Sequence, residues 1–157
     1  MDALDVLTRE QMHVEALFPQ LEATDDLERL SALDSLAFVL RRLIVVERQY
    51  LFPLIGEIAL EPWVASAKAA HEMLLSLIAD LEVSSTEEEP FAKQAALRSL
   101  ITRHFDRQDA SLFPLLRERL SAERLEAIGQ KMERALETFD VWNPRVTAWC
   151  EPQALSA

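Results

Sequence analysis

One helical hairpin occurs twice in this chain, and the repeat restricts the folds that the sequence can adopt. Gln11-Met-His-Val-Glu-Ala-Leu-Phe-Pro-Gln-Leu-Glu22 aligns with His71-Glu-Met-Leu-Leu-Ser-Leu-Ile-Ala-Asp-Leu-Glu82, and both end in Leu-Glu. At nearly the same offset follow Leu43-Ile-Val-Val-Glu-Arg-Gln-Tyr-Leu-Phe-Pro53 and His104-Phe-Asp-Arg-Gln-Asp-Ala-Ser-Leu-Phe-Pro114, which share a closing Leu-Phe-Pro. Two copies of an antiparallel helical hairpin predict a four-helix bundle.

Apolar residues recur at spacings of three and four, the pattern of amphipathic helices. We expect helices over about 2–23, 26–58, 90–119 and 122–138, with a further helix starting near Pro62. Proline should kink the first helix at Pro19 and bend or break the second at Pro53. The caps are expected at Asp25 or Asp26 for the second helix and at Ser121 for the fifth.

The expected fold class is therefore all-α: an up-down four-helix bundle with a short fifth helix over 1–139 and an irregular tail over 140–157. One or both of Trp142 and Trp149 should pack back on the bundle. The segment Ser84-Ser-Thr-Glu-Glu-Glu-Pro90 is predicted to be a polar connection between the second pair of helices.

Composition excludes several classes of protein. The 157 residues contain only two glycines, and no glycine-rich phosphate loop is present. The formal net charge of −11 repels phosphate backbones, so nucleic-acid binding is not expected. No apolar run is long enough to span a bilayer, and the N-terminus lacks a signal-peptide pattern. The single cysteine, Cys150, fits a cytoplasmic protein.

Each of the four predicted bundle helices carries a polar side chain inside its apolar stripe, near the middle of the helix. These residues are Gln11, Glu47, His71, His104 and Gln108. In an up-down bundle the helix middles meet at one level. Buried polar groups are costly unless they have partners, so these side chains should bond one another or bind a ligand.

A metal ion would satisfy this set of side chains. Two imidazoles and one carboxylate, from His71, His104 and Glu47, suit a non-haem iron with open positions, or zinc. Tyr50 lies one turn beyond Glu47 on the same face, and Gln11 and Gln108 are the other candidate residues around the ion. His13 points about 200° away from Gln11 and is expected at the surface.

The repeated hairpins, the Leu-Phe-Pro closures and the spacing before them resemble the hemerythrin-like, HHE cation-binding family over about residues 2–138. The resemblance implies that His71 and His104 are metal ligands and that Glu47 is a bridging glutamate. Asp109, five residues after His104, matches the spacing of a bridging aspartate in that family. On a regular helix Asp109 points about 140° from His104, so it reaches the site only if the helix is locally distorted, for example by a π-bulge.

The chain departs from that family in its first hairpin and at one position of its second. Gln11 and Leu43 stand where the resemblance implies two histidines, and Gln108 takes the alternative carboxylate position. Leucine cannot ligate a metal, so an ordinary oxygen-binding di-iron centre is not expected. The remaining possibility is a single ion bound by His71, His104 and Glu47, with Asp109 as a further ligand.

The sequence leaves several functions open. The first is a non-enzymatic sensor or binding protein that holds one non-haem iron or zinc ion and reports oxygen, redox state or metal supply. The second is a metal-free bundle with a regulatory protein partner. The third is a binder of haem or another apolar ligand beside His71 or His104. We expect a monomer or a homodimer, and no general base indicates an enzyme.

Overall fold

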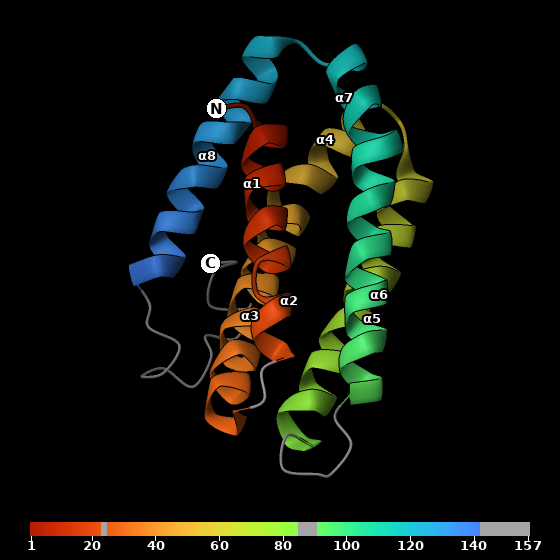
Figure 1. The fold of residues 1–157 in the computed structure, drawn as a ribbon. Helices are drawn as coiled ribbons and strands as arrows, with labels where there is room; N and C mark the ends of the chain where they lie inside the picture. The colour runs from red at the N-terminus through yellow and green to blue at the C-terminus, as the bar shows by residue number, and fades with distance from the viewer. Residues whose placement is uncertain (23–24, 85–90, 142–157) are drawn as a thin grey trace.

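The computed structural model describes residues 1–22, 25–84 and 91–141, and all secondary structure in these ranges is helical (Figure 1). This confirms the all-α class. None of the described helices is long and apolar enough to cross a membrane. The predicted polar connection, apart from its first residue, and Trp142, Trp149 and Cys150 lie outside the described residues.

The first predicted helix is two helices in the structure. α1 (Ala3–Glu15) is capped by Asp2, whose carboxylate accepts hydrogen bonds from the backbone of Leu4 and Asp5. α1 ends at Glu15, and the four-residue α2 (Phe18–Leu21) follows. In a regular helix the ring of Pro19 would collide with the carbonyl of Glu15. Pro19 also has no backbone N–H to donate to that carbonyl. The kink expected at Pro19 is a break between two helices, at residues 16–17.

The second predicted helix is continuous despite Pro53. α3 (Asp26–Val46) is capped by Asp25, as predicted, and passes into η1 (Glu47–Leu51) and α4 (Phe52–Glu57) without a break. η1 is a π-helical turn, in which the backbone N–H of Phe52 donates to the carbonyl of Glu47. This wider turn accommodates the proline, which would otherwise clash with the preceding turn.

The second hairpin repeats this arrangement. α5 (Glu61–Ser84) packs against α6 (Phe91–Arg107), which continues through a second π-turn, η2 (Gln108–Leu112), into α7 (Phe113–Arg119). Each π-turn begins six residues before the proline of a Leu-Phe-Pro triplet. The sequence repeat is therefore also a backbone repeat.

The last described helix, α8 (Ala122–Val141), covers the first hairpin. The hydroxyl of Ser121 accepts a hydrogen bond from the backbone N–H of Arg124, as expected of a cap. α8 packs chiefly against α1 and also against α3. The contact with α1 is close at Gly129, where an added Cβ would lie 2.7 Å from the carbonyl carbon of Asp2.

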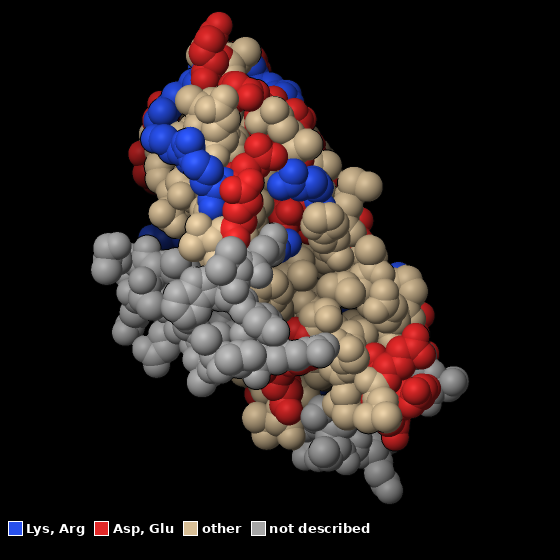
Figure 2. Space-filling model, turned by 90° about the vertical axis from the view of Figure 1, so that its left-hand side faces the viewer, with Lys and Arg blue, Asp and Glu red and all other residues tan. Residues whose placement is uncertain are grey.

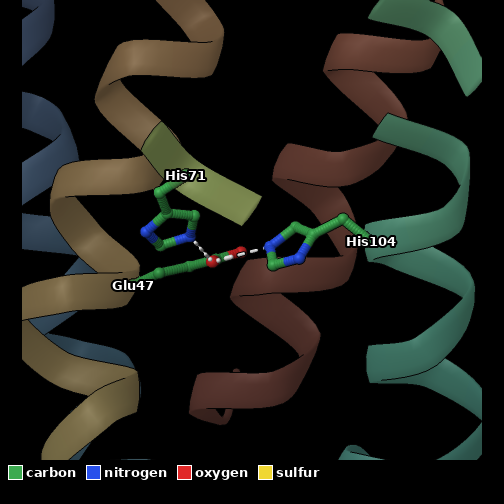
Figure 3. Close-up of side chains that lie close together, drawn as sticks. All are labelled: Glu47, His71 and His104. Atoms are coloured by element: carbon green, nitrogen blue, oxygen red, sulfur yellow. Dashed lines mark hydrogen bonds and ion pairs between the residues drawn. The ribbon is translucent and has the colours of Figure 1, made fainter. Parts of the chain in front are cut away.

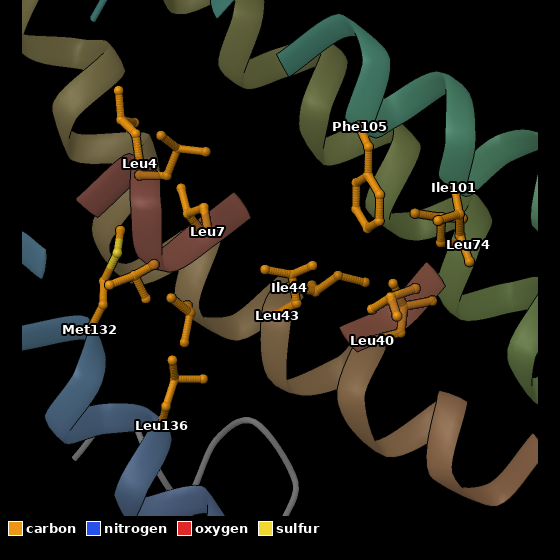
Figure 4. Close-up of a cluster of buried hydrophobic side chains, with 14 of the residues drawn as sticks. Leu4, Leu7, Leu40, Leu43, Ile44, Leu74, Ile101, Phe105, Met132 and Leu136 are labelled. Atoms are coloured by element: carbon orange, nitrogen blue, oxygen red, sulfur yellow. The ribbon is translucent and has the colours of Figure 1, made fainter. Parts of the chain in front are cut away.

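The core is made by the apolar stripes that the periodicity predicts. Its side chains come from α1, α3, α5, α6 and α8 and meet between these helices (Figure 4). The residues labelled there are Leu4, Leu7, Leu40, Leu43, Ile44, Leu74, Ile101, Phe105, Met132 and Leu136, each at most 4 % exposed. Burial of these stripes on adjacent helices stabilises the bundle-like arrangement.

The surface mixes charges of both signs. On the face viewed in Figure 2, acidic and basic side chains are interspersed over the upper part. Some pairs join elements far apart in sequence: Arg9 lies 3.2 Å from Glu133, and Arg124 pairs with Glu57. Exposed pairs of this kind contribute little, so the apolar core dominates stability.

Candidate metal centre

Three elements deliver the central side chains. Glu47 is the first residue of η1, His71 lies in the middle of α5, and His104 lies in the last turn of α6. The three side chains point toward one another between these helices (Figure 3). One ligand atom from each lies within 4.8 Å of the others, a group that could hold a metal ion. The predicted meeting of these residues at one level is confirmed.

Glu47 is the centre of the group. Its Oε2 lies 2.6 Å from Nε2 of His71 and 3.0 Å from Nε2 of His104. Its Oε1 accepts a 2.9 Å hydrogen bond from Nε2 of Gln108. Glu47 and His71 are completely buried, and the side chain of His104 is 10 % exposed. A buried carboxylate is costly unless it is paired and hydrogen-bonded, and three donors meet this requirement here.

The two glutamines extend the network toward α1. Nε2 of Gln11 donates to Oε1 of Gln108 at 2.8 Å, and both side chains are buried. The second π-turn starts at Gln108 and presents this side chain to Glu47. Nε2 of Gln108 also lies 3.2 Å from Nε2 of His104, a contact between two groups that both donate to Glu47.

Arg48 determines the tautomer of His71. Its Nε donates to Nδ1 of His71 at 3.2 Å. A guanidinium has no acceptor atom, so Nδ1 is unprotonated and Nε2 carries the proton donated to Glu47. Phe52 stacks on the imidazole at 5.4 Å between ring centroids and holds its plane.

The electrostatics favour an ion pair in the core. Burial by itself would raise the pKa of Glu47, but the charge of His104 and the hydrogen bonds from both histidines hold it far below its usual range. Burial would lower the pKa of His104, but attraction to Glu47 and their hydrogen bond raise it above the ordinary value. The charge of Arg107 opposes that rise. Glu47 is therefore ionised, and its proximity favours the charged form of His104.

The donor set fits one metal ion with small movements. Tetrahedral zinc with bonds of 2.0–2.2 Å separates its ligand atoms by about 3.4 Å. The 2.6 and 3.0 Å distances to Glu47 would have to lengthen by less than about 1 Å as the ion replaces the shared protons. Nδ1 of His71 would then carry the proton, so the exposed side chain of Arg48 would have to turn away.

The structure does not bring Asp109 to this group. The helix is distorted into a π-turn there, as its participation required, but the turn directs Gln108 to Glu47 and leaves Asp109 exposed. Burial raises the pKa of Asp109, a hydrogen bond with Gln11 opposes this, and Asp106 adds to the rise. Asp109 thus supports Gln11 from outside the group.

The remaining predicted residues occupy different places. Tyr50 is half-buried and packs against the apolar core, and the hydrogen bonds to Glu47 from described residues come from other side chains. Leu43 is core filler, only 1 % exposed. The side chain of His13 is 53 % exposed, which confirms the prediction of a surface position.

The space beside His104 is small. A cleft between α5 and the junction of α6 with η2 has a volume of about 20 Å³ and is lined in part by Trp63, His104 and Gln108. Ligand sites for drug-sized molecules occupy about 300–1,000 Å³. The cleft therefore has no room for haem, the third function that the sequence left open.

Three features of the site were not predicted from sequence. Arg48 carries no periodic signal, because it is simply the residue after Glu47. Arg107 could have been found, since it lies one helical turn after His104. A buried ion pair joins Arg42 to Glu10 at 2.5 Å and links α3 to α1. These residues directly precede Leu43 and Gln11, which lie in the apolar stripes of their helices.

No family model, curated protein or solved structure matches this chain.

Proposed function

We propose that this protein binds one non-haem iron or zinc ion through Glu47, His71 and His104 and acts as a binding or sensor protein. The observation that carries the proposal is the convergence of two imidazole nitrogens and one carboxylate within 4.8 Å in the core. Two histidines and one carboxylate form a site that leaves positions open on iron. We further propose an up-down, hemerythrin-like four-helix bundle as the scaffold, supported by the duplicated hairpin and its two π-turns.

The burial of the group supports binding without enzymatic turnover. His71 and Glu47 have no exposed surface, and the cleft beside His104 holds about 20 Å³. A substrate larger than a few atoms cannot reach the ligand atoms in this conformation. The bound ion would supply Lewis acidity or a change of oxidation state. The chain would fix the ligands through Gln108 and Phe52 and exclude water through the surrounding leucines.

A metal-free regulatory bundle is the second candidate, and a specific observation favours it. Every donor around Glu47 has an acceptor without an ion, and Arg48 holds His71 in the tautomer that donates to Glu47. A ligated histidine normally donates its other ring N–H to an acceptor, whereas Arg48 brings a donor to that nitrogen. In this alternative the polar core would give the bundle a single register.

Metal stoichiometry separates the two candidates. The full chain would be stripped with a chelator, reloaded with Zn²⁺ or with Fe²⁺ under nitrogen, desalted and analysed for metal content. We expect about one ion per chain from a single site. His71→Ala should lose the ion, whereas His13→Ala, which alters an exposed histidine, should retain it. Circular dichroism confirms that each variant is folded.

Two results would overturn metal binding. One is a wild-type chain that retains no ion after reloading. The other is a folded His71→Ala variant with the same metal content as wild type. Either result would leave the metal-free bundle as the function to pursue.

A further inference from the structure

One arginine, Arg107, lines the cleft beside His104. Nη1 of Arg107 donates to Oγ of Ser66 at 2.9 Å and so links α6 to α5. The same guanidinium lies 4.9 Å from the ring centroid of Trp63, a cation–π distance. Arg107, Ser66 and Trp63 all line the cleft together with His104 and Gln108.

The polar lining of the cleft is rich in donors. A guanidinium offers five N–H groups and no acceptor, and the Ser66 hydroxyl, which accepts from Arg107, keeps its own hydrogen to donate. A ligand here must therefore accept hydrogen bonds.

The charge around the cleft is opposite to that of the whole chain. The molecule has a formal net charge of −11, yet none of the described residues that line this cleft carries a carboxylate. The carboxylate of Glu47, which contacts His104 and Gln108 of the lining, is already compensated by His71, His104 and Gln108. Arg107 therefore places a positive charge at the mouth of a small, partly apolar space.

The size of the space limits the ligand. A volume of about 20 Å³ exceeds the roughly 10–15 Å³ that one water-sized species needs. Tetrahedral oxyanions are several times larger. A single-atom anion fits without moving the helices.

We propose that the cleft between α5 and the α6–η2 junction binds a halide-sized monovalent anion, held by the N–H groups of Arg107 and the hydroxyl of Ser66. The site does not depend on the proposed metal.

Histidine NMR tests this site directly, because the chain has only three histidines. The probe is sodium chloride, titrated into the metal-free, full-length chain labelled with ¹³C-histidine, with sodium sulfate holding the ionic strength constant. We expect a saturable shift of the His104 signal as chloride replaces sulfate. The signal of the exposed His13 should not move and serves as the internal control.

Variants locate the ion. Arg107→Gln should weaken chloride binding at least about tenfold, since it removes the charged donor. Ser66→Ala keeps every charge and should weaken binding a few-fold by removing one hydrogen bond. Arg103→Gln removes an exposed arginine of the same helix that does not line this cleft, and it should bind chloride as wild type does.

Several results would overturn the proposal. The NMR signal of His104 could stay in place as chloride replaces sulfate, or it could move linearly without saturation. Equal chloride affinity in wild type and Arg107→Gln would also exclude this site. Because the titration uses metal-free protein, these results are independent of metal stoichiometry.

Discussion

Glu47 takes a position in the α3 stripe that would otherwise be apolar, and its charge organises the side chains around it. Its carboxylate receives His71, His104 and Gln108, and no part of it is exposed. Removing one partner of a buried ion pair typically costs about 3–5 kcal/mol, because the other charge is left without compensation. The network therefore strongly constrains the register of α5 and α6 against η1.

This ion pair makes stability depend on pH in a defined window. Glu47 has a lowered pKa, so its contribution is present above its ordinary value of 4.5 and is lost as the pH falls. His104 has a raised pKa, so its contribution is complete below 6.5 and is lost as the pH rises through its folded pKa. The pair should stabilise the fold most between these two values.

We expect His104→Asn to lower the free energy of unfolding by about 3 kcal/mol near pH 5.5. The difference from wild type should shrink as the pH rises above 6.5 and through the raised pKa of His104, because the wild type then loses this contribution. Urea unfolding of both proteins from pH 5 to 9 measures this difference. A difference that stays constant over the range would show that His104 is not charged in the folded protein.

Gln108 offers a second test at the residue scale. Gln108→Glu replaces an amide that lies 2.9 Å from Glu47 with another carboxylate. Two buried carboxylates repel, so the metal-free variant should lose about 1–3 kcal/mol of stability. Zn²⁺ should restore the stability, because the new carboxylate can serve as a further ligand and should tighten zinc binding about tenfold or more.

Gln130→Glu is the matched control, since it adds the same charge at an exposed position of α8. Thermal unfolding with and without Zn²⁺ compares the two variants. If metal-free Gln108→Glu is as stable as Gln130→Glu, the side chain at position 108 does not face Glu47.

At the scale of the elements, the helix backbone accommodates the prolines of the three Leu-Phe-Pro triplets in two different ways. Before Pro19 the helix ends at Glu15, four residues earlier, whereas before Pro53 and Pro114 it widens into a π-turn. The steric problem is the same in each case, because proline clashes with the carbonyl four residues back. In the two long helices the π-turns begin at Glu47 and Gln108 and so position these side chains within the core.

The contact between the N-terminus and α8 predicts opposite effects at the two glycines. A Cβ on Gly129 would lie 2.7 Å from the carbonyl carbon of Asp2 and 2.8 Å from the nitrogen of Ala3, both backbone atoms. We expect Gly129→Ala to destabilise the protein by about 2 kcal/mol through overpacking. A Cβ on Gly56 meets no atom within 4 Å, so Gly56→Ala in α4 should stabilise by about 0.5–1 kcal/mol.

Urea unfolding at a single pH measures both glycine variants. A Gly129→Ala protein as stable as Gly56→Ala would mean that α1 does not begin against α8 as described. The comparison is well matched, because both substitutions add one methyl group at a helical glycine with negative φ.

At the scale of the whole molecule, the two hairpins have diverged. The second hairpin contributes His71, His104 and Gln108 to the polar level, and the first contributes Glu47 and Gln11. The first hairpin also places Leu43 in the core, where a histidine would complete a duplicated site. The polar group is consequently suited to a single ion at most, and the resemblance to hemerythrin-like proteins stays a prediction.

The same scale explains why the helices of this chain could be predicted more fully than its site. The apolar stripes, the caps at Asp25 and Ser121 and the meeting of Glu47, His71 and His104 follow from helical periodicity and from the repeat. Asp109 could not be excluded from sequence. The direction of its side chain depends on how the backbone accommodates Pro114. From sequence, either Gln108 or Asp109 could have faced Glu47.

The sequence by itself therefore determined the helical class, the buried faces and the level at which the polar side chains lie. These properties are local, because the angle between successive residues of a helix fixes which side chains share a face. Only the tertiary structure decided that Gln108 faces Glu47, that Arg48 sets the tautomer of His71 and that Arg107 of α6 bonds Ser66 of α5. Such contacts depend on how the chain accommodates its prolines and on how separate elements pack, and neither is encoded in the periodicity of any one helix.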